Sequence, residues 1–493
     1  MARTRALFLD KAWARLRGGH GQSEIPDIIN LRDINSGWNL FRSGVLGSLR
    51  SGQVGPDYVE IIDLPKNPVG VRPIARLSVH DRLVYDTLVF AIADLIDDQV
   101  RDTVYSARWR NGGKEFWTPV DSWVSMQKHG VEIVNAAPFQ LARTDVVSFY
   151  EHIDVGTLSL DLQALGANQR VVERLENYLK MFQASSHAWG IPQGPDASGI
   201  LANLYLLPVD EFVHREGIEY LRYSDDMMLF DTDWTSLRGL LLEINSILRS
   251  RRLSMSSTKT NIYEHSESRK QLEDLEKDAI NYGLKIGEIG AGDLLYKLFT
   301  QAISPHQRDR DVKFSLYRMG EWMADDRAIP WVMSNLVESH HLASNLLAYL
   351  ECFPNRRTAI GRTLSSSLAL VADKSYDYLE QKILSSATRQ QIRSRKIKDL
   401  AWAILKNKNK SNLPREFAAR YLGRFSSPAD GQLLRGVYEG EASPSVRRAL
   451  LVAMYEARSV PQGLLRQLAN SGSELSWVCN YLLKDPLVPL PRS

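Results

Sequence analysis

The sequence predicts an α+β unit followed by an all-α tail, and three observations carry this prediction. The chain has 493 residues, more than one hydrophobic core usually supports, so two or three domains are expected. From about residue 58 to 263, short apolar strands alternate with longer helical stretches, as in a mixed unit of helices and sheet. After about residue 265 the strand signals largely vanish and helix-sized blocks follow one another.

Composition narrows the class of protein. With 44% hydrophobic and 24% charged residues, the chain is globular rather than disordered. The net charge of +3 neither demands nor excludes a nucleic-acid partner. The two cysteines, Cys352 and Cys479, are far apart, so their spacing suggests neither a zinc site nor a disulfide framework and fits a reducing cytoplasm. The first apolar run stops at Asp10 and no stretch is long enough to span a bilayer, so we expect a cytoplasmic protein with no membrane partner.

The elements expected from apolar spacing follow in chain order. An amphipathic segment opens the chain, and the mixed unit should hold strands at 59–64, 139–147, 220–223 and 227–230 and helices at 79–96 and 198–215. A charged helical stretch follows at 268–278, and the tail should hold helical blocks at 331–350, 415–423, 446–458 and 464–483. Two of these blocks share a basic and then Ala/Leu-rich face after a proline. This recurrence favours stacked hairpins similar to HEAT repeats, and a plain helical bundle accounts for it equally well.

Two adjacent acids, Asp225 and Asp226, lie between the strands expected at 220–223 and 227–230. Read locally, they mark a turn, where Asp is favoured, and Ser224 before them has no assigned role. A third acid, Asp145, comes at the end of another strand. Carboxylates held together repel one another, and divalent cations relieve that repulsion. Two such ions about 3.5–4 Å apart stabilise the attacking and leaving oxygens of a phosphoryl displacement, so the three acids predict nucleotidyl transfer.

The motifs that carry these acids resemble those of reverse transcriptases. Asp145-Val-Val-Ser-Phe-Tyr150 and Tyr223-Ser-Asp-Asp226 are similar to the two acidic motifs of the family. Residues 190–205 resemble its Pro-Gln-Gly loop and the helix after it, and residues 66–74 with 81–85 resemble the fingers of group II intron and retron enzymes. Four motifs in the family's order over about 200 residues argue against chance.

The resemblance implies an RNA-directed DNA polymerase with the fingers and palm of a right-hand polymerase. The expected domains are a helical extension at 1–45, fingers at 46–143, a palm at 144–265, a helical connector at 266–325 and a helical-repeat domain at 326–493. Asp145, Asp225 and Asp226 would be catalytic, and together with Val146 they would bind two Mg²⁺ ions, with Mn²⁺ as a substitute.

The resemblance also implies a nucleotide-binding set. Lys66 and Arg72 would face the triphosphate, and Tyr150 would pack under the sugar and favour dNTPs. Gln193 and Gly194 would contact nucleotide or template, and Lys259 would face the leaving pyrophosphate. Read alone, the three cations are solvated surface charges and Tyr150 is an ordinary core tyrosine.

Two further features bear on the site. Ser198 is expected to cap the helix that follows it, and Gly199 stands where the family commonly has proline. Residues 108–117 interleave cations with aromatics around a Gly-Gly turn, a mix typical of nucleic-acid binding. The candidates there are Arg108, Trp109, Arg110 and Lys114, and a hairpin whose tryptophans merely pack explains the segment equally well.

A short polymerase with a long helical tail is similar to the abortive-infection group of bacterial reverse transcriptases, which act against phage. That resemblance implies homo-oligomers that bind RNA or DNA. It leaves open whether synthesis starts on a protein side chain, proceeds without a template, or uses an associated non-coding RNA. Two alternatives remain: a sensor or scaffold in which the polymerase fold is an RNA-binding platform, and a retroelement enzyme that copies its own RNA.

Overall fold

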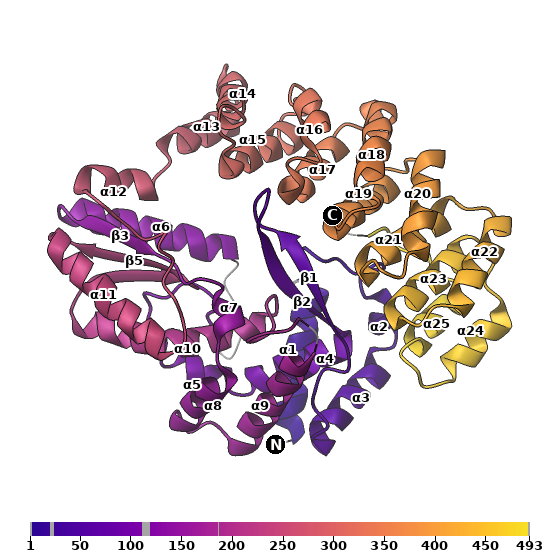
Figure 1. The fold of residues 1–493 in the computed structure, drawn as a ribbon, viewed down its shortest axis with the longest axis horizontal. Coiled ribbons are helices and arrows are strands. Elements are labelled where there is room, and N and C mark those ends of the chain that lie inside the picture. The colour runs from indigo at the N-terminus through magenta and orange to yellow at the C-terminus, as the bar shows by residue number, and fades with distance from the viewer. Residues whose placement is uncertain (1, 20–23, 111–118, 186, 492–493) are drawn as a thin grey trace. The chain divides into compact units, whose positions relative to one another are not determined.

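The computed structural model describes residues 2–19, 24–110, 119–185 and 187–491 (Figure 1). The chain divides into two compact units. The first contains Met1–Gly21, Arg42–Ile61 and Ile74–Asp278, and the second contains Gln22–Phe41, Ile62–Pro73 and Ala279–Ser493. Within the described ranges, every helix is too short or too polar to cross a membrane.

A four-stranded sheet organises the first unit. Its strand order is β4-β5-β3-β6, and each neighbouring pair is antiparallel. The strands are β3 (Gln140–Thr144), β4 (Glu219–Tyr223), β5 (Asp226–Asp231) and β6 (Asn261–Tyr263). Thr144, the last residue of β3, lies opposite Met227 near the start of β5. The end of β3 and the turn between β4 and β5 therefore meet at the same edge of the sheet.

Helices cover both faces of this sheet. Leu141, Leu221, Met228 and Phe230 share one face and form a core with residues of α6 (Pro119–Ala136) and α12 (His265–Leu272). Helix α10 (Asp196–Arg215) contacts strand β4, and helix α11 (Trp234–Ser250) contacts strand β5. Figure 1 shows α6 and α11 on opposite sides of the strands. The alternation of side chains along each strand thus gives two buried faces.

Several other helices of the first unit pack on α10 or on one another. Helices α4 and α8 contact α10, and α9 contacts both α4 and α8. Their bounds, with those of the other helices lying wholly or mainly in this unit, are α1 (Ala2–Arg17), α3 (Trp38–Ser51), α4 (Val79–Phe90), α5 (Ala93–Asp97), α7 (Phe149–His152), α8 (Val155–Ala164) and α9 (Gln169–Ala184).

Several expected elements are confirmed and others need correction. The strands at 220–223 and 227–230 are present as β4 and β5, whereas the strand expected at 139–147 stops at Thr144. The helix expected at 79–96 is divided into α4 and α5 by the residues after Phe90. Ser198 does not cap α10, which begins at Asp196. The Ser198 hydroxyl instead donates to the carbonyl of Pro192 and bonds the Tyr85 hydroxyl at 2.9 Å.

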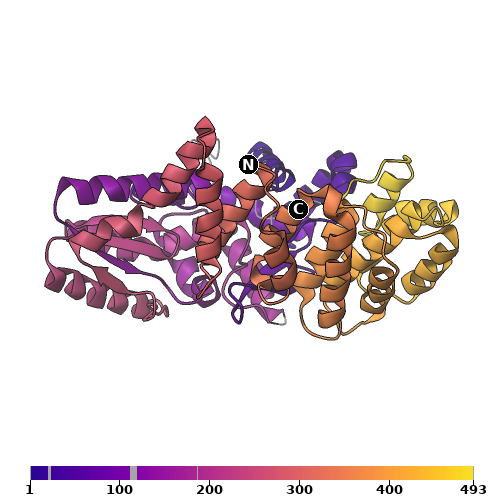
Figure 2. The same ribbon diagram turned by 90° about the horizontal axis from the view of Figure 1, so that it is seen from above.

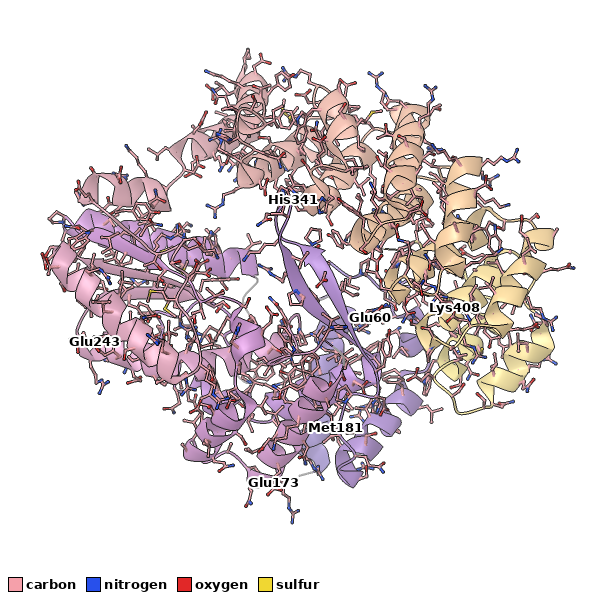
Figure 3. All side chains as sticks on the ribbon, in the orientation of Figure 1. Glu60, Glu173, Met181, Glu243, His341 and Lys408 are labelled. Atoms are coloured by element: carbon pink, nitrogen blue, oxygen red, sulfur yellow. The ribbon has the colours of Figure 1, made fainter. Side chains whose placement is uncertain are left out.

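A two-stranded hairpin lies between α3 and α4 in the chain. Its strands are β1 (Val59–Pro65) and β2 (Val71–Leu77), and Arg76 pairs with Glu60 across them at 3.0 Å. Figure 3 labels Glu60 on this hairpin. At the turn, the Lys66 N–H donates to the Gly70 carbonyl at 2.8 Å, and Asn67 Oδ1 accepts from the Gly70 N–H at 2.6 Å. The outer residues of the hairpin, 62–73, group with the second unit.

Helices alone form the long tail of the second unit, as far as the structure describes it. Helices α15, α17, α19, α21, α23 and α25 pack on one another in series, and the helices between them pack on this row (Figures 1 and 2). The bounds are α13 (Leu275–Ile286), which spans the boundary between units, α14 (Ala291–Ala302), α15 (Asp309–Glu321), α16 (Ile329–Asn335), α17 (Ala343–Glu351), α18 (Arg357–Val371), α19 (Asp377–Arg389), α20 (Arg395–Lys406), α21 (Asn412–Phe425), α22 (Pro428–Glu439), α23 (Pro444–Glu456), α24 (Gln462–Ala469) and α25 (Ser476–Leu482).

The N-terminal part of the second unit packs on this tail. Helix α2 (Arg32–Ser36) contacts α25. Arg448 of α23 pairs with Asp27 and with Asp33, each at 2.7 Å. Two of the expected tail blocks, 415–423 and 446–458, correspond to α21 and α23, whereas 331–350 and 464–483 are each broken by a turn.

Candidate active site

Asp145 follows the last residue of β3 and is buried. Its carbonyl accepts from the Ser256 N–H at 2.7 Å, and the Val147 N–H donates to the Ser254 carbonyl at 2.9 Å. Between them, Val146 is buried and bridges to Met255. The backbone after β3 is thus held by residues 254–256, which fixes where Asp145 leaves the sheet.

The turn between β4 and β5 carries the two adjacent acids. Tyr223 and Asp226 are partners across the turn, so Asp225 lies at its tip beside Ser224. Burial raises the pKa of Asp225 above its usual range, and the charges of Asp145 and Asp226 raise this pKa further. Since Asp145 acts on Asp225 electrostatically, the structure brings together acids that are 80 positions apart in the sequence.

The charge of Lys259 opposes this repulsion. Its ammonium forms an ion pair with Asp145 and lowers the pKa of Asp225. The Lys259 side chain is 48% exposed, so it reaches the carboxylate from solvent. Lys259 follows the 254–256 segment that pairs with the backbone of Asp145, which explains why these two residues meet.

The donor chemistry of this site fits a divalent cation. Three carboxylates offer hard oxygen ligands of the kind Mg²⁺ prefers, and their mutual repulsion is what a cation relieves. As they lie, the described residues contain no group of three or more His, Cys, Asp or Glu side chains gathered closely enough to hold a metal ion. The Lys259 ammonium is the cation that Asp145 contacts here.

Tyr150 lies on the short helix α7, directly after the Asp145 segment. Its carbonyl accepts from the Ile191 N–H at 3.0 Å. A Cβ at Gly199 would lie 3.9 Å from the Tyr150 hydroxyl and 2.7 Å from the Cβ of Ala107. The structure thus places Tyr150 beside the Pro-Gln-Gly loop, and the close approach of Ala107 explains why a glycine stands at position 199.

The Pro-Gln-Gly loop also contacts the base of the hairpin. The carbonyl of Gln193 accepts from the Ala75 N–H at 3.0 Å. Gly194 has a φ of 121°, a value that side chains rarely allow, and a Cβ there would lie 3.4 Å from Ile74. Gln193 is half-buried and Gly194 is exposed. The loop therefore contacts both α7, through Tyr150, and strand β2, through Ala75.

Lys66 and Arg72 are exposed. Lys66 lies at the hairpin turn and Arg72 on β2. Both belong to residues 62–73, which group with the second unit, whereas the carboxylates belong to the first. The structure thus shows both cations exposed to solvent on one hairpin, and their predicted contact with a triphosphate stays a prediction.

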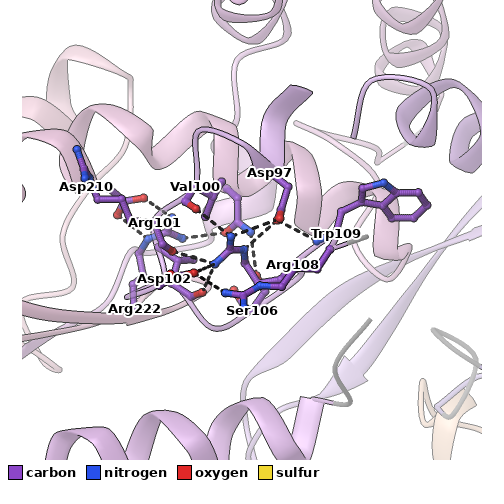
Figure 4. Close-up of polar contacts among 12 residues, drawn as sticks. Asp97, Val100, Arg101, Asp102, Ser106, Arg108, Trp109, Asp210 and Arg222 are labelled. Atoms are coloured by element: carbon purple, nitrogen blue, oxygen red, sulfur yellow. Dashed lines mark hydrogen bonds and ion pairs between the residues drawn. The ribbon is translucent and has the colours of Figure 1, made fainter. Parts of the chain in front are cut away.

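Arg108, a sequence candidate for nucleic-acid binding, is buried. Figure 4 shows its polar contacts. Its Nε donates to the carboxylate of Asp97 at 2.8 Å. Its other nitrogens donate to the carbonyls of Val100 and Arg101 at 2.9 Å and of Val104 at 3.1 Å. These bonds hold the loop after α5 together. As it lies, the Arg108 guanidinium is part of the interior and not of a nucleic-acid surface.

Its neighbours differ in exposure. Trp109 is also buried, and its ring packs on Phe90 with 4.4 Å between ring centroids. Arg110 is partly exposed and pairs with Asp102 at 2.6 Å. Lys114 lies outside the described residues. The packing of Trp109 agrees with the interpretation in which this tryptophan serves the core, and Trp117 lies outside the described residues.

A buried polar network beside the acidic turn was not foreseen from the sequence. Arg222 is fully buried and pairs with Asp210 of α10 at 2.6 Å. Arg222 also donates to the side-chain oxygen of Asn203, and Asn203 donates to the carbonyl of Ser106. Figure 4 labels Ser106, Asp210 and Arg222. The available signal was an arginine inside an otherwise apolar strand, because a buried charge needs a buried partner.

Comparison with known proteins gives a match to one family over part of the chain. Residues 64–282 match the family model described as reverse transcriptase (RNA-dependent DNA polymerase). This segment contains Asp145, Asp225, Asp226 and every nucleotide-binding candidate. A search of curated proteins gave no match.

Solved structures give a remote likeness to telomerases. Apo telomerase from Candida tropicalis lacking its C-terminal domain is 13% identical with a TM-score of 0.31, covering 46% of this chain and 55% of that one. The apo telomerase of Candida tropicalis is 11% identical with a TM-score of 0.33, covering 75% of this chain and 74% of that one. The telomerase of Candida albicans with the TWJ fragment of telomeric RNA is 9% identical with a TM-score of 0.33, covering 74% and 70%. Such scores are too low to establish a shared fold.

Proposed function

Residues 64–282 form a reverse transcriptase domain, and from this premise we propose that the whole chain is a DNA polymerase that joins dNTPs on a nucleic-acid strand. The observation that carries the proposal is the placement of Asp145 and Asp225, whose carboxylates interact at one edge of the sheet. Reverse transcriptase domains generally use divalent ions, usually Mg²⁺. Burial and then the charge of Asp145 raise the pKa of Asp225, and a divalent ion beside these acids would favour their charged forms.

Each residue of the site has a role in this reaction. Asp145, Asp225 and Asp226, with the backbone carbonyl of Val146, would hold two Mg²⁺ ions, which supply positive charge to the attacking and leaving oxygens. Lys259 lies beside Asp145 and can donate a proton to the leaving pyrophosphate.

The nucleotide would contact a second set of residues. Tyr150 would pack under the sugar, where a ring excludes a 2′-hydroxyl and so favours deoxynucleotides. Gln193 and Gly194 would contact the nucleotide or the template strand, because the loop they form lies next to Tyr150 through Ile191. Lys66 and Arg72 are exposed cations on the hairpin and suit the triphosphate.

The direct test is incorporation of labelled dNTPs on a primed RNA template with Mg²⁺. Asp225→Asn should lower the rate at least about a hundredfold, since it removes a charged ligand from the reacting centre. Asp94→Asn, on the exposed first turn of α5, is the matched control and should keep full activity. Incorporation that persists in Asp225→Asn, or that does not need a divalent ion, would refute the proposal.

We further propose that this polymerase acts in bacterial antiphage defence. The support is the resemblance of the chain to the abortive-infection group, together with the row of packed helices that follows the polymerase domain. Protection of a bacterial culture from phage should be lost in Asp225→Asn. Full protection by that variant would favour the alternative in which the tail is a sensor or scaffold.

The starting point of synthesis has its own test. DNA covalently attached to the purified protein would indicate a protein side chain as primer, and a single copurifying RNA would indicate an associated non-coding RNA. Sequencing that nucleic acid would also identify a retroelement, whose own RNA would be the template. The mass of the purified particle would test the proposed homo-oligomer.

A further inference from the structure

Ser224, the residue before the two acids, is held by both of its backbone groups. Its φ is 58°, in the left-handed region that residues other than glycine seldom adopt. Its N–H donates to Ser106 Oγ at 2.7 Å, and its carbonyl accepts from Arg222 Nη1 at 2.9 Å. An unfavourable backbone conformation persists only where its surroundings enforce it, and here two side chains do so.

Arg222 is itself fixed on its remaining sides. It is fully buried, and its Nε and Nη2 donate to the two carboxylate oxygens of Asp210 at 2.8 and 2.6 Å. Its Nη1 also donates to Asn203 Oδ1 at 3.1 Å. Burial alone would lower the pKa of Arg222, but the charge of Asp210 raises this pKa overall. The guanidinium therefore stays charged and locked on α10.

Ser106 is fixed by a short backbone pairing with β4. The Arg222 N–H donates to the Thr103 carbonyl and the Tyr105 N–H donates to the Arg222 carbonyl, each at 2.9 Å. Asn203 Nδ2 donates to the Ser106 carbonyl at 2.8 Å. Farther along, Arg108 ties this loop to α5 through Asp97 (Figure 4).

These bonds close a ring. From Ser224 it runs to Ser106, then through Asn203 to Arg222, and back to Ser224. Three separate segments contribute to it: the loop after α5, the helix α10 and the strand β4. A chain of hydrogen bonds that returns to its start resists displacement at every member, because moving one group breaks two bonds.

We propose that Ser106, Asn203 and Arg222 are positioning residues that set the direction of Asp225 by holding Ser224 in its left-handed conformation. The proposal rests on the proposed function, since it concerns where the catalytic carboxylate points. A purely structural network would stabilise the fold without affecting cation binding. A positioning network changes cation affinity and turnover even where the fold is kept.

Ser106→Ala is the sharpest test, because it removes one acceptor and leaves no buried charge. Arg222→Ala is unsuited, since it strands Asp210 in the interior. We expect Ser106→Ala to weaken Mn²⁺ binding to the full-length protein, measured by electron paramagnetic resonance, about tenfold. We expect kcat to fall about tenfold with little change in the KM for dNTP. Ser106→Thr keeps the hydroxyl and should restore both values.

Ser159→Ala is the matched control. Ser159 is a buried serine of α8 in the same unit, and its hydroxyl donates to Glu176 at 2.6 Å. This variant should lower Tm about as much as Ser106→Ala does and leave Mn²⁺ binding and kcat unchanged. Asn203→Ala, which opens the ring at another member, should reproduce the Ser106→Ala result.

The possible results distinguish the positioning role from the proposed polymerase function. If Ser106→Ala and Asn203→Ala bind Mn²⁺ and turn over like the unmodified protein while Asp225→Asn is inactive, the positioning role is overturned and the proposed function stands. Equal losses of Mn²⁺ affinity and kcat in Ser106→Ala and Ser159→Ala would overturn the positioning role as well. If Asp225→Asn stays active, the proposed function fails instead.

Discussion

Replacing Gly190 by alanine tests whether the Pro-Gln-Gly loop is docked on the helix that carries Tyr150. Gly190 has a φ of 59°. A Cβ at this position would overlap the carbonyl oxygen of Tyr150 and lie 2.6 Å from the carbonyl carbon of Glu151. Both neighbours are backbone atoms, so no side-chain rotation can relieve the overlap.

The magnitude has two parts. A left-handed conformation costs alanine about 1–2 kcal/mol, and an overpacked contact typically costs about 1–3 kcal/mol more. Gly190→Ala should therefore lower the free energy of unfolding by about 2–5 kcal/mol. Gly166 has a φ of 77° with nothing within 4 Å of its Cβ position, so Gly166→Ala carries only the first part.

The assay is urea denaturation of both variants, followed by tryptophan fluorescence, together with the KM for dNTP. Because the overlap displaces either the loop or Tyr150, Gly190→Ala should also raise this KM several-fold, whereas Gly166→Ala should not. Equal destabilisation by the two variants would refute the reasoning. So would an unchanged KM in a Gly190→Ala protein that folds.

Three further predictions concern other parts of the chain. Tyr150→Ala should raise the kcat/KM for ATP relative to dATP at least tenfold. An unaltered ratio would contradict the role of Tyr150 in excluding the 2′-hydroxyl. Gly423→Ala should cost about 1–3 kcal/mol, because its Cβ would lie 2.7 Å from a backbone oxygen of α23. A Cβ at Gly436 of α22 would meet no atom within 4 Å, so Gly436→Ala should instead stabilise the fold by roughly 0.5–1 kcal/mol. Thermal unfolding of the two variants measures both effects. Burial raises the pKa of Glu380 from 4.5 to about 7, although Lys410 lowers it. A carboxyl with a raised pKa destabilises the fold as pH rises through this window, by about 3 kcal/mol in full. Glu380→Gln should remove that loss, and identical Tm differences between pH 4.5 and 7.5 in both proteins would contradict it.

The acidic turn could be predicted because its signals are local. Asp225 and Asp226 stand between two apolar strands, and turn chemistry and strand alternation are properties of neighbouring residues. The place of Asp145 follows once the strands pair antiparallel, since the end of β3 must then meet the start of β5. Its ion pair with Lys259 was not foreseen, because it depends on how residues 254–256 return to the sheet.

Other features depend on partners that only the folded chain supplies. Arg108 stands among aromatics and glycines, where an exposed arginine and a buried one look alike in sequence. Its buried position is decided by Asp97 and by three carbonyls of a loop. Strand β2 was missed because only Ala75 of its seven residues is buried, so no apolar alternation marks it.

The left-handed backbone of Ser224 has a consequence for the range of sequences this motif accepts. The residue at position 224 must adopt a left-handed backbone, and its side chain is free to vary because the bonds that hold it come from its own N–H and carbonyl. In a saturation library, glycine, asparagine and aspartate should therefore be enriched there, and valine, isoleucine and threonine depleted. The residue between Tyr223 and the two acids would then be chosen for its backbone conformation, while Asp225 and Asp226 are chosen for the chemistry of their side chains.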